Sequence, residues 1–265
     1  MSDPQIRLLC YNLYMERPLI QQIQSFAIPD GLRKTLLDLA GEAEKLSPSL
    51  SKRTAWRVGY ALERIASEAA DASLDVHWWE IYLYMLGKYA AEAGPTGQAV
   101  VDLARKAVSP LRSHFGPYQP VTLRLIDADT VRGVCLLSDT LEEPQNSMVA
   151  PNAISLAQAH FNPHAWFRAI YAGKAPVGFV MIVDDDQTPE YFLWRFMIAT
   201  PFQRRDYGRQ AIERLVDYVR TRPNARELGV SCGEGPGSPR GFYEKIGFIS
   251  TGEVIDDELV LKLAL

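Results

Sequence analysis

The sequence predicts two structural classes in one chain: an all-helical domain over residues 1–118 and an α+β domain, with a mixed β-sheet and flanking helices, over residues 119–265. Two observations predict this division. Apolar residues recur every three or four positions through the first part, whereas the second part contains three consecutive apolar, aromatic or β-branched runs separated by turn residues. The segment "GPYQP", residues 116–120, lies where the pattern changes.

Length and composition exclude several classes of protein. With 265 residues, 47% apolar and 23% charged, the chain has the make-up of a globular protein of two domains. A net charge of −4 argues against a nucleic-acid partner. The first residues do not have the basic character of a signal peptide, and no apolar run approaches the roughly 20 residues that cross a bilayer. We therefore expect a cytoplasmic protein without a membrane partner.

The helical half divides into about five amphipathic segments, the first of which begins with Asp3 as N-cap and Pro4 as the first helical residue. We expect their apolar stripes to form the core of a bundle. These stripes are Ile6, Leu9, Cys10, Leu13 and Tyr14; Leu32, Leu36, Leu39 and Ala43; Ala55, Gly59, Leu62, Ala66 and Ala69; Trp79, Leu83, Leu86 and Ala90; and Val100, Val101, Ala104, Ala107, Val108 and Leu111. No known family is recognised in this half.

The second half alternates strands and helices in the manner of an α+β domain. Turn residues separate its central strands, and Ser238 followed by Pro239 marks the start of its last helix. The predicted order is a strand at 121–126, helices at 127–137 and near 152–161, strands at 165–173, 175–186 and 190–200, a helix at 207–220, a strand at 227–232, a helix at 238–247, and strands near 248–252 and 258–264.

Cysteine and histidine residues form no metal or disulfide pattern. Cys10, Cys135 and Cys232 are odd in number, far apart and without a CxxC pair. His160 and His164 are four positions apart, but a proline between them breaks the helix that would align them. We expect no metal cofactor. A Walker-type phosphate loop and a dinucleotide fingerprint are also absent from the sequence, so kinase and dehydrogenase functions have no support.

The stretch "IATPFQRRDYGRQAIERLVDYV", residues 198–219, joins an apolar strand to a helix through a charged loop. The first amide groups of a helix have no intrahelical partner and carry partial positive charge. Arg204, Arg205 and Arg209 add full positive charge nearby. The stretch therefore predicts a phosphate-binding loop between Phe202 and Gly208, although a basic connector would have the same composition.

Residues 120–265 resemble the GNAT superfamily of acyl-coenzyme A dependent N-acetyltransferases. The order of strands is similar, "QRRDYG" at 203–208 stands where the family has its pyrophosphate loop, and "GFYEKIGF" at 241–248 resembles the family's later helix. "VAPNAISLAQAHF", "APVGFVMI" and "WRFMIATPFQ" look most like diamine acetyltransferases of the spermine/spermidine type and related antibiotic-modifying enzymes.

The resemblance implies a role for each motif. Acetyl-coenzyme A would bind at the residues Ile198, Gln203, Arg204, Arg205, Asp206, Tyr207, Gly208 and Arg209. The backbone N–H near Ile198 would hydrogen-bond the thioester oxygen, and Tyr243 would protonate the departing sulfur as general acid. Tyr243 could instead be a packing residue beside Phe242 and Ile246.

The chain departs from the family pattern at two positions. Asp206 replaces the first glycine of the loop; aspartate tolerates left-handed backbone angles, but its carboxylate repels a pyrophosphate. Pro236 stands where the family commonly has an asparagine. Both departures concern the coenzyme site, so they motivate an alternative function as an acyl-coenzyme A sensor or partner-binding protein.

Acetyl transfer to an alkyl amine requires a base, because the amine has a pKa of about 10.4 and is protonated at neutral pH. Glu190, at the start of a central strand, is our first choice by position. Glu142, Glu143 and the acidic run 184–186 remain alternatives, and each could be a solvated surface charge. The face of Trp194 could hold an ammonium group or simply pack in the core.

Together these patterns predict an acetyl-coenzyme A dependent N-acetyltransferase that acts on a primary amine of a small cationic substrate, either a polyamine or an amine-bearing antibiotic. The predicted catalytic residues are Tyr243 and Glu190. A homodimer is left open, and the sequence does not identify the role of residues 1–118.

Overall fold

The computed structural model describes residues 23–24, 28–70, 76–115 and 120–265. Contacts divide the chain into two compact units, Met1–Pro117 and Tyr118–Leu265, and each is described by itself. The predicted helix that begins at Asp3, together with Cys10, lies outside the described residues.

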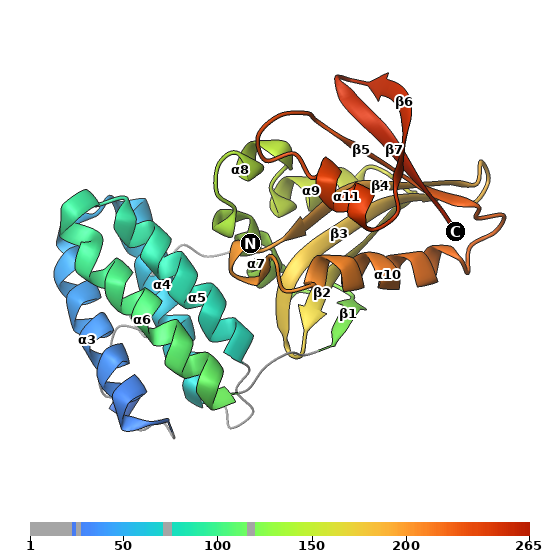
Figure 1. The fold of residues 1–265 in the computed structure, drawn as a ribbon. Helices are drawn as coiled ribbons and strands as arrows, with labels where there is room; N and C mark the ends of the chain where they lie inside the picture. Colours follow the sequence, from blue (N-terminus) through green and yellow to red (C-terminus); the bar gives the residue numbers. More distant parts are fainter. Residues whose placement is uncertain (1–22, 25–27, 71–75, 116–119) are drawn as a thin grey trace, which may run out of the picture. The chain divides into compact units, whose positions relative to one another are not determined.

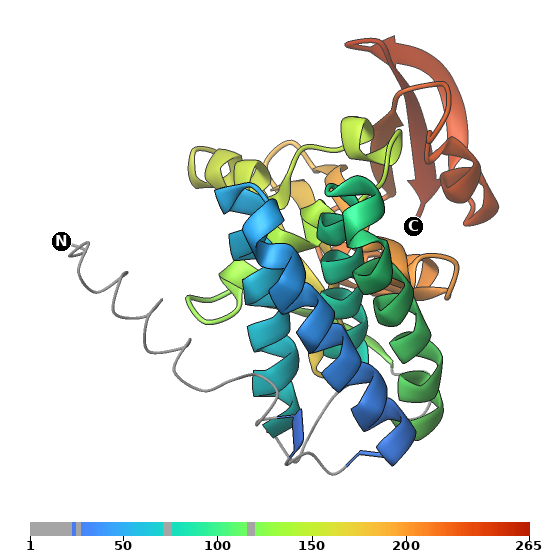
Figure 2. The same ribbon diagram turned by 90° about the vertical axis from the view of Figure 1, so that its left-hand side faces the viewer.

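The described part of the first unit is helical. Its helices are α3 (Asp30–Leu46), α4 (Lys52–Ala70), α5 (Val76–Ala91) and α6 (Gln98–Phe115), with short 3₁₀ turns η1 (Ser47–Ser49) and η2 (Gly94–Gly97). Figures 1 and 2 show them running side by side, with α3 against α6, α6 against α5 and α5 against α4. The prediction of a helical bundle is confirmed for this part of the unit.

Burial confirms the predicted inner faces of α3 and α5, but the predicted face of α4 is wrong. Val58, Ala61 and Ile65 are buried in α4, whereas Gly59 is exposed and Leu62 is half-buried. Neighbouring positions on a helix differ by about 100°, so a shift of one residue selects a different stripe. The stripe that contains valine and isoleucine removes more apolar area from water than one of alanine and glycine, and it therefore faces the core.

The second unit is a mixed seven-stranded sheet with flanking helices, which confirms the predicted α+β class. Along the sheet the strands follow the order β1, β2, β3, β4, β5, β7, β6, and only β4 and β5 pair in parallel. The strands are β1 (Val121–Arg124), β2 (Ala165–Ala172), β3 (Ala175–Asp185), β4 (Glu190–Ile198), β5 (Glu227–Cys232), β6 (Ile249–Ile255) and β7 (Glu258–Ala264).

Helices cover both faces of this sheet (Figure 1). They are α7 (Val131–Leu136), α8 (Gln145–Met148), α9 (Asn152–His160), α10 (Tyr207–Val219) and α11 (Arg240–Lys245), with 3₁₀ turns η3 (Leu137–Thr140) and η4 (Thr200–Phe202). Successive residues of a strand point to opposite faces. Met197 of β4 contacts Asn152 of α9, and Ile198 lies beside Gly208 of α10. The α9 side and the α10 side of β4 are therefore opposite faces of the sheet.

Two predicted helix starts differ from the structure. The helix predicted from residue 127 begins at Val131, because the Asp127 carboxylate accepts hydrogen bonds from the backbone N–H groups of Asp129 and Thr130 and closes a turn instead. The helix predicted from Ser238 begins at Arg240. The Ser238 hydroxyl donates to the Gly233 carbonyl over 2.6 Å and accepts the Arg240 N–H, so this serine still serves the start of the helix.

The sheet opens between its two parallel strands. β4 and β5 pair only at Phe192 with Gly229 and at Leu193 with Val230, and beyond these pairs the strands separate. The register of β4 against β3 also shifts here, because Leu193 pairs with Ile182 and Arg195 with Met181, which leaves Trp194 in a bulge. We call the gap beyond Leu193 and Val230 the strand opening. It is the feature of the fold that positions the candidate site.

Candidate active site

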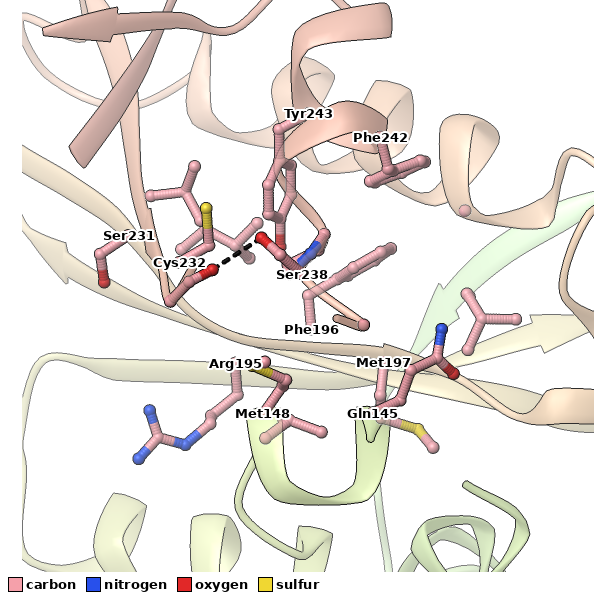
Figure 3. Close-up of a pocket in the computed structure, with 18 of the residues that line it drawn as sticks. Gln145, Met148, Arg195, Phe196, Met197, Ser231, Cys232, Ser238, Phe242 and Tyr243 are labelled. Atoms are coloured by element: carbon pink, nitrogen blue, oxygen red, sulfur yellow. Dashed lines mark hydrogen bonds between the residues drawn. The ribbon is translucent and has the colours of Figure 1, made fainter. Parts of the chain in front are cut away.

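A cavity of about 1100 Å³ occupies the strand opening (Figure 3). It is lined by β4 from Phe192 to Ile198, by the end of β5, by the start of α10, and by residues of α8 and α11. Cavities of this size hold large cofactors and substrates. Its walls change from charged at the α10 end to apolar and aromatic in the middle, where Phe196 and Phe242 stack with ring centroids 5.9 Å apart.

The main chain at the end of β4 faces the cavity. The Ala199 N–H donates to the Val177 carbonyl of β3 over 2.8 Å, and in a strand the backbone groups of alternate residues point in opposite directions. The N–H and C=O groups of Ile198 therefore point away from β3, toward the strand opening. The Gln203 side chain donates to the Ile198 carbonyl over 3.0 Å and to Gln145 Oε1 over 2.9 Å, which fixes the following loop to the strand.

The loop from Gln203 to Asp206 turns sharply into α10. Arg204 and Asp206 have φ angles of 61° and 69°, so Asp206 does adopt the left-handed angles that replace those of a glycine. Gly208, the second residue of α10, lies against Phe242, because a Cβ at this position would be 3.3 Å from the ring. The first amide groups of α10 have no partner inside the helix and carry partial positive charge. This end of the cavity is suited to an anion.

Charges at this end are partly neutralised within the protein. The Asp206 carboxylate accepts hydrogen bonds from Arg209 over 2.7 and 2.5 Å, and Arg209 also pairs with Glu213 over 2.5 Å. The Arg209 hydrogen bonds hold the pKa of Asp206 below its ordinary value, and Asp206 raises the pKa of Arg209. The Asp206 carboxylate, which the sequence analysis expects to repel a pyrophosphate, is therefore bound to the Arg209 guanidinium.

The structure brings together only some of the residues that the sequence singles out. Arg205 does not line the cavity and lies over the Phe202 ring at 5.5 Å, and Tyr207 is buried beside the same ring. Any contact of Tyr207 with a ligand would therefore come from its main chain. The predicted residues that do line the cavity are Ile198, Gln203, Arg204, Asp206, Gly208, Arg209, Trp194 and Tyr243.

None of the carboxylates considered as a base at the sequence level lines the cavity. Glu190 is exposed and lies outside the cavity. In the strand register it is opposite Asp185, at the turn between β3 and β4. Glu142 and Glu143 are exposed as well. Asp184 is engaged elsewhere, since it accepts hydrogen bonds from the hydroxyl of Tyr218 and from Arg222. These side chains are not brought together with Tyr243.

Tyr243 extends from α11 toward β5 and is only 4% exposed (Figure 3). Its ring packs between Phe242 and Phe248, with centroid distances of 5.3 and 5.4 Å. Burial, followed by the proximity of Cys232 and Glu258, raises the pKa of its hydroxyl well above the ordinary value. Tyr243 is therefore protonated at neutral pH and can donate a hydrogen bond or a proton.

Sequence reasoning missed several polar residues of the cavity, among them Arg195, Ser231 and Glu258. The Ser231 hydroxyl donates a hydrogen bond to the Glu258 carboxylate. Glu258 lies 27 positions from Ser231 in the sequence and reaches it through the pairing of β5 with β7. No local motif marks Glu258, so only the pairing of these strands could have identified it.

Over the described ranges, no group of three or more His, Cys, Asp or Glu side chains is arranged to hold a metal ion. In the same part of the chain, no helix is both long enough and apolar enough to cross a membrane.

Residues 136–248 match the model of the acetyltransferase (GNAT) family. No curated protein matches the chain. Among solved structures, an acetyltransferase from Thermus thermophilus is similar at 19% identity and a TM-score of 0.44, covering 56% of this chain and 99% of its own.

Two further solved structures cover a similar part of the chain. A chimera of the Vibrio cholerae spermidine N-acetyltransferase SpeG and hSSAT is 17% identical, with a TM-score of 0.43 over 55% of this chain and 96% of its own. The PaiA N-acetyltransferase from Thermoplasma acidophilum, in complex with coenzyme A, is 10% identical, with a TM-score of 0.45 over 56% of this chain and 100% of its own.

Proposed function

Residues 136–248 carry a domain of the acetyltransferase (GNAT) family, and we propose that the protein transfers the acetyl group of acetyl-coenzyme A to a primary amine of a small cationic substrate, a polyamine or an amine-bearing antibiotic, in the cytoplasm. One observation carries this proposal. The strand opening between β4 and β5 continues as a single cavity to the start of α10.

The residues of the cavity are chemically suited to acetyl-coenzyme A. Arg204 and the amide groups at the start of α10 would hold the diphosphate, and the absence of a side chain at Gly208 keeps this end open beside Phe242. The apolar wall of Phe196, Phe242 and Ile246 would contact the pantetheine arm. The coenzyme supplies an activated thioester.

Each catalytic task in this proposal has a group at the strand opening. The Ile198 N–H points into it and would donate a hydrogen bond to the oxygen that becomes negatively charged during attack. Tyr243, buried and protonated, would give its proton to the departing sulfur. The carboxylates of Asp256 and Glu258 line the same cavity, as do Arg195 and Lys245, and a cationic acceptor would bind against the two carboxylates.

The proposal is tested by release of free thiol from acetyl-coenzyme A with a panel of polyamines and aminoglycoside-type amines. Wild-type protein should release thiol with at least one of them, and Tyr243→Phe should reduce kcat by about 10²-fold or more, the usual contribution of a general acid. Tyr191→Phe is the matched control, because Tyr191 is also 4% exposed but lies outside the cavity. Wild-type protein that releases no thiol, while a working GNAT enzyme does so in parallel, would contradict the proposal.

One observation supports a second candidate function, that of an acyl-coenzyme A sensor. The Asp206 carboxylate lines the cavity at the expected diphosphate site, where it would weaken binding of an anion. Titration of acetyl-coenzyme A by calorimetry separates the two functions. Binding without turnover on any amine supports the sensor, whereas turnover that Tyr243→Phe abolishes supports the enzyme.

A further inference from the structure

The two last residues of β5 point to opposite faces of the sheet at the strand opening. Ser231 is the first residue after Val230, the last that pairs with β4. Cys232 follows it, and Figure 3 shows the Ser231 hydroxyl and the Cys232 thiol on different sides of the strand. Cys232 lies on the side of Tyr243, whose pKa it raises. Ser231 therefore faces the side opposite to the proposed general acid.

Glu258 is fixed on this opposite side. It is half-buried, lines the cavity, and accepts a hydrogen bond from Ser231. It is the first residue of β7, directly after a turn in which Asp256 and Asp257 have φ angles of 50° and 65°. Two-residue turns of this kind make tight, well-defined hairpins. The pairing of Cys232 with Leu259 then places the start of β7 beside the end of β5.

Charged and titratable groups from three neighbouring elements, β4, α11 and β5, interact with this carboxylate. From β4, the half-buried guanidinium of Arg195 has its pKa lowered by burial and raised by Glu258. Arg195 is held by hydrogen bonds to the Trp194 carbonyl over 2.8 Å and to Gln158 over 3.3 Å. From α11 and β5, Tyr243 and Cys232 interact electrostatically with Glu258, and Asp256 lines the cavity from the hairpin. Glu258 is thus within electrostatic reach of both sides of the strand opening.

We propose that Glu258 is the general base of the transfer reaction, an assignment that rests on the proposed function. An ammonium group of the acceptor gives one proton to Glu258. The neutral nitrogen forms a bond to the thioester carbon while the carbon–sulfur bond breaks, and Tyr243 protonates the sulfur. The nitrogen's second proton replaces the one lost by Tyr243, and Glu258 releases its proton to water. The sum converts an ammonium ion and a thioester into an amide, a thiol and one proton.

Geometry favours Glu258 over the carboxylate first predicted from the sequence. Glu190 is exposed at the opposite end of β4 from Ile198 and does not line the cavity. Glu258 is at the point where the strands separate and faces the side from which Tyr243 is absent. An acceptor entering there would approach the thioester carbon with its amine against the carboxylate, while the leaving sulfur of the donor lies against the phenol.

The experiment measures thiol release by wild type, Glu258→Gln and Glu258→Asp at neutral pH, with two nucleophiles. With a primary alkyl amine, which is mostly protonated, Glu258→Gln should lower kcat by about 10²- to 10⁴-fold. With hydroxylamine, which is already neutral, the loss should be less than about tenfold, because no proton has to be removed before attack. Glu258→Asp keeps a carboxylate and should show the same preference with a smaller loss.

The matched control is Glu253→Gln, an exposed carboxylate of β6 outside the cavity, which should behave as wild type. Calorimetric binding of acetyl-coenzyme A, unchanged in each variant, shows that the variant is folded. If Glu258→Gln does not fold, Glu258→Asp tests the assignment: its loss of kcat should be larger with the alkyl amine than with hydroxylamine.

Three results would overturn the assignment while leaving the proposed function intact: wild-type rates in the Glu258 variants, equal losses with both nucleophiles, or an amine-specific loss in Glu190→Gln instead. An inactive wild type would overturn both proposals, so the two failures are distinguishable.

Discussion

Asp206 has left-handed backbone angles, lines the cavity, and is paired with Arg209. Replacing it with glycine or asparagine removes its charge from the expected diphosphate site, and both residues accept left-handed angles. A repulsion of about 1 kcal/mol between exposed charges corresponds to roughly a fivefold change in affinity. We therefore expect Asp206→Gly and Asp206→Asn to bind acetyl-coenzyme A about three- to tenfold more tightly than wild type in calorimetry. Unchanged or weaker binding in both would show that the carboxylate does not oppose the ligand.

Gly208 of α10 lies against the Phe242 ring of α11. A Cβ there would lie 3.3 Å from two atoms of the Phe242 ring, so Gly208→Ala should displace this ring into the cavity. We expect the Kd for acetyl-coenzyme A to rise several-fold. Gly241→Ala is the control, since a Cβ at Gly241 has no neighbour within 4 Å; this variant should bind normally and gain about 0.5 kcal/mol in free energy of unfolding. Equal binding by both variants would contradict the expectation.

At the scale of the elements, Asp184 of β3 holds the C-terminal end of α10. Its side chain, 8% exposed, accepts hydrogen bonds from the Tyr218 hydroxyl over 2.5 Å and from Arg222 over 2.9 Å. The Tyr218 ring also stacks on Trp166 of β2, with centroids 4.2 Å apart. These contacts hold one end of α10 while its other end lines the cavity, so they support the position of the proposed anion site.

Tyr218→Phe should lower the free energy of unfolding by about 1.5 kcal/mol, the lower part of the range for a hydrogen bond to a charged group, because the phenol is half-exposed. Burial, followed by Asp184, raises the pKa of Tyr218 to about 12. A raised folded-state pKa contributes stability that is complete below the unfolded value of about 10 and is lost as the pH rises through about 12. The difference between wild type and Tyr218→Phe in urea unfolding should therefore shrink as the pH rises from neutral through this range. A difference that stays constant would assign the effect to packing alone.

At the scale of the elements, apolar periodicity predicted most of the helices and strands, whereas residue type alone did not predict which contacts their side chains make. The strands of the second unit and the inner faces of α3 and α5 follow from apolar spacing, which responds directly to burial. The inner face of α4 was missed because two stripes, one residue apart, both contain apolar residues, and only the neighbouring helices select between Val58 and Gly59. Asp184 was considered as a base, but tertiary contacts with Tyr218 and Arg222 give it a structural role.

At the scale of the whole molecule, every residue that lines the cavity belongs to the second unit. This unit also has a buried core of its own, which includes Phe179, Phe202 and Leu215. We therefore expect residues 118–265, expressed alone, to fold cooperatively and to bind acetyl-coenzyme A with the Kd of the intact chain. Circular dichroism during urea unfolding, followed by calorimetry, checks this. A fragment that folds but does not bind would assign the first unit a role in the site.

Sequence reasoning led to cavity residues where they are continuous in sequence. Gln203, Asp206 and Gly208 lie within one strand-to-helix connection, so local chemistry was enough to predict an anion loop there, and all three line the cavity. Glu258 and Ser231 meet only because β7 pairs with β5, and this long-range register leaves no local signal. For the same reason the position of Glu190 in the chain gave no information on its distance from Tyr243.

The placement of Ser231 and Cys232 on opposite faces of β5 also bears on the order of events during turnover. Donor and acceptor that arrive from different sides can be present together, and burial raises the pKa of the Cys232 thiol, which disfavours the thiolate needed for a covalent acyl-enzyme. Double-reciprocal plots at several fixed amine concentrations should therefore intersect, as for a ternary complex, and mass spectrometry after incubation with the donor alone should find no acetylated protein. Parallel lines with a mass increase of one acetyl group would instead identify a ping-pong route through the protein itself.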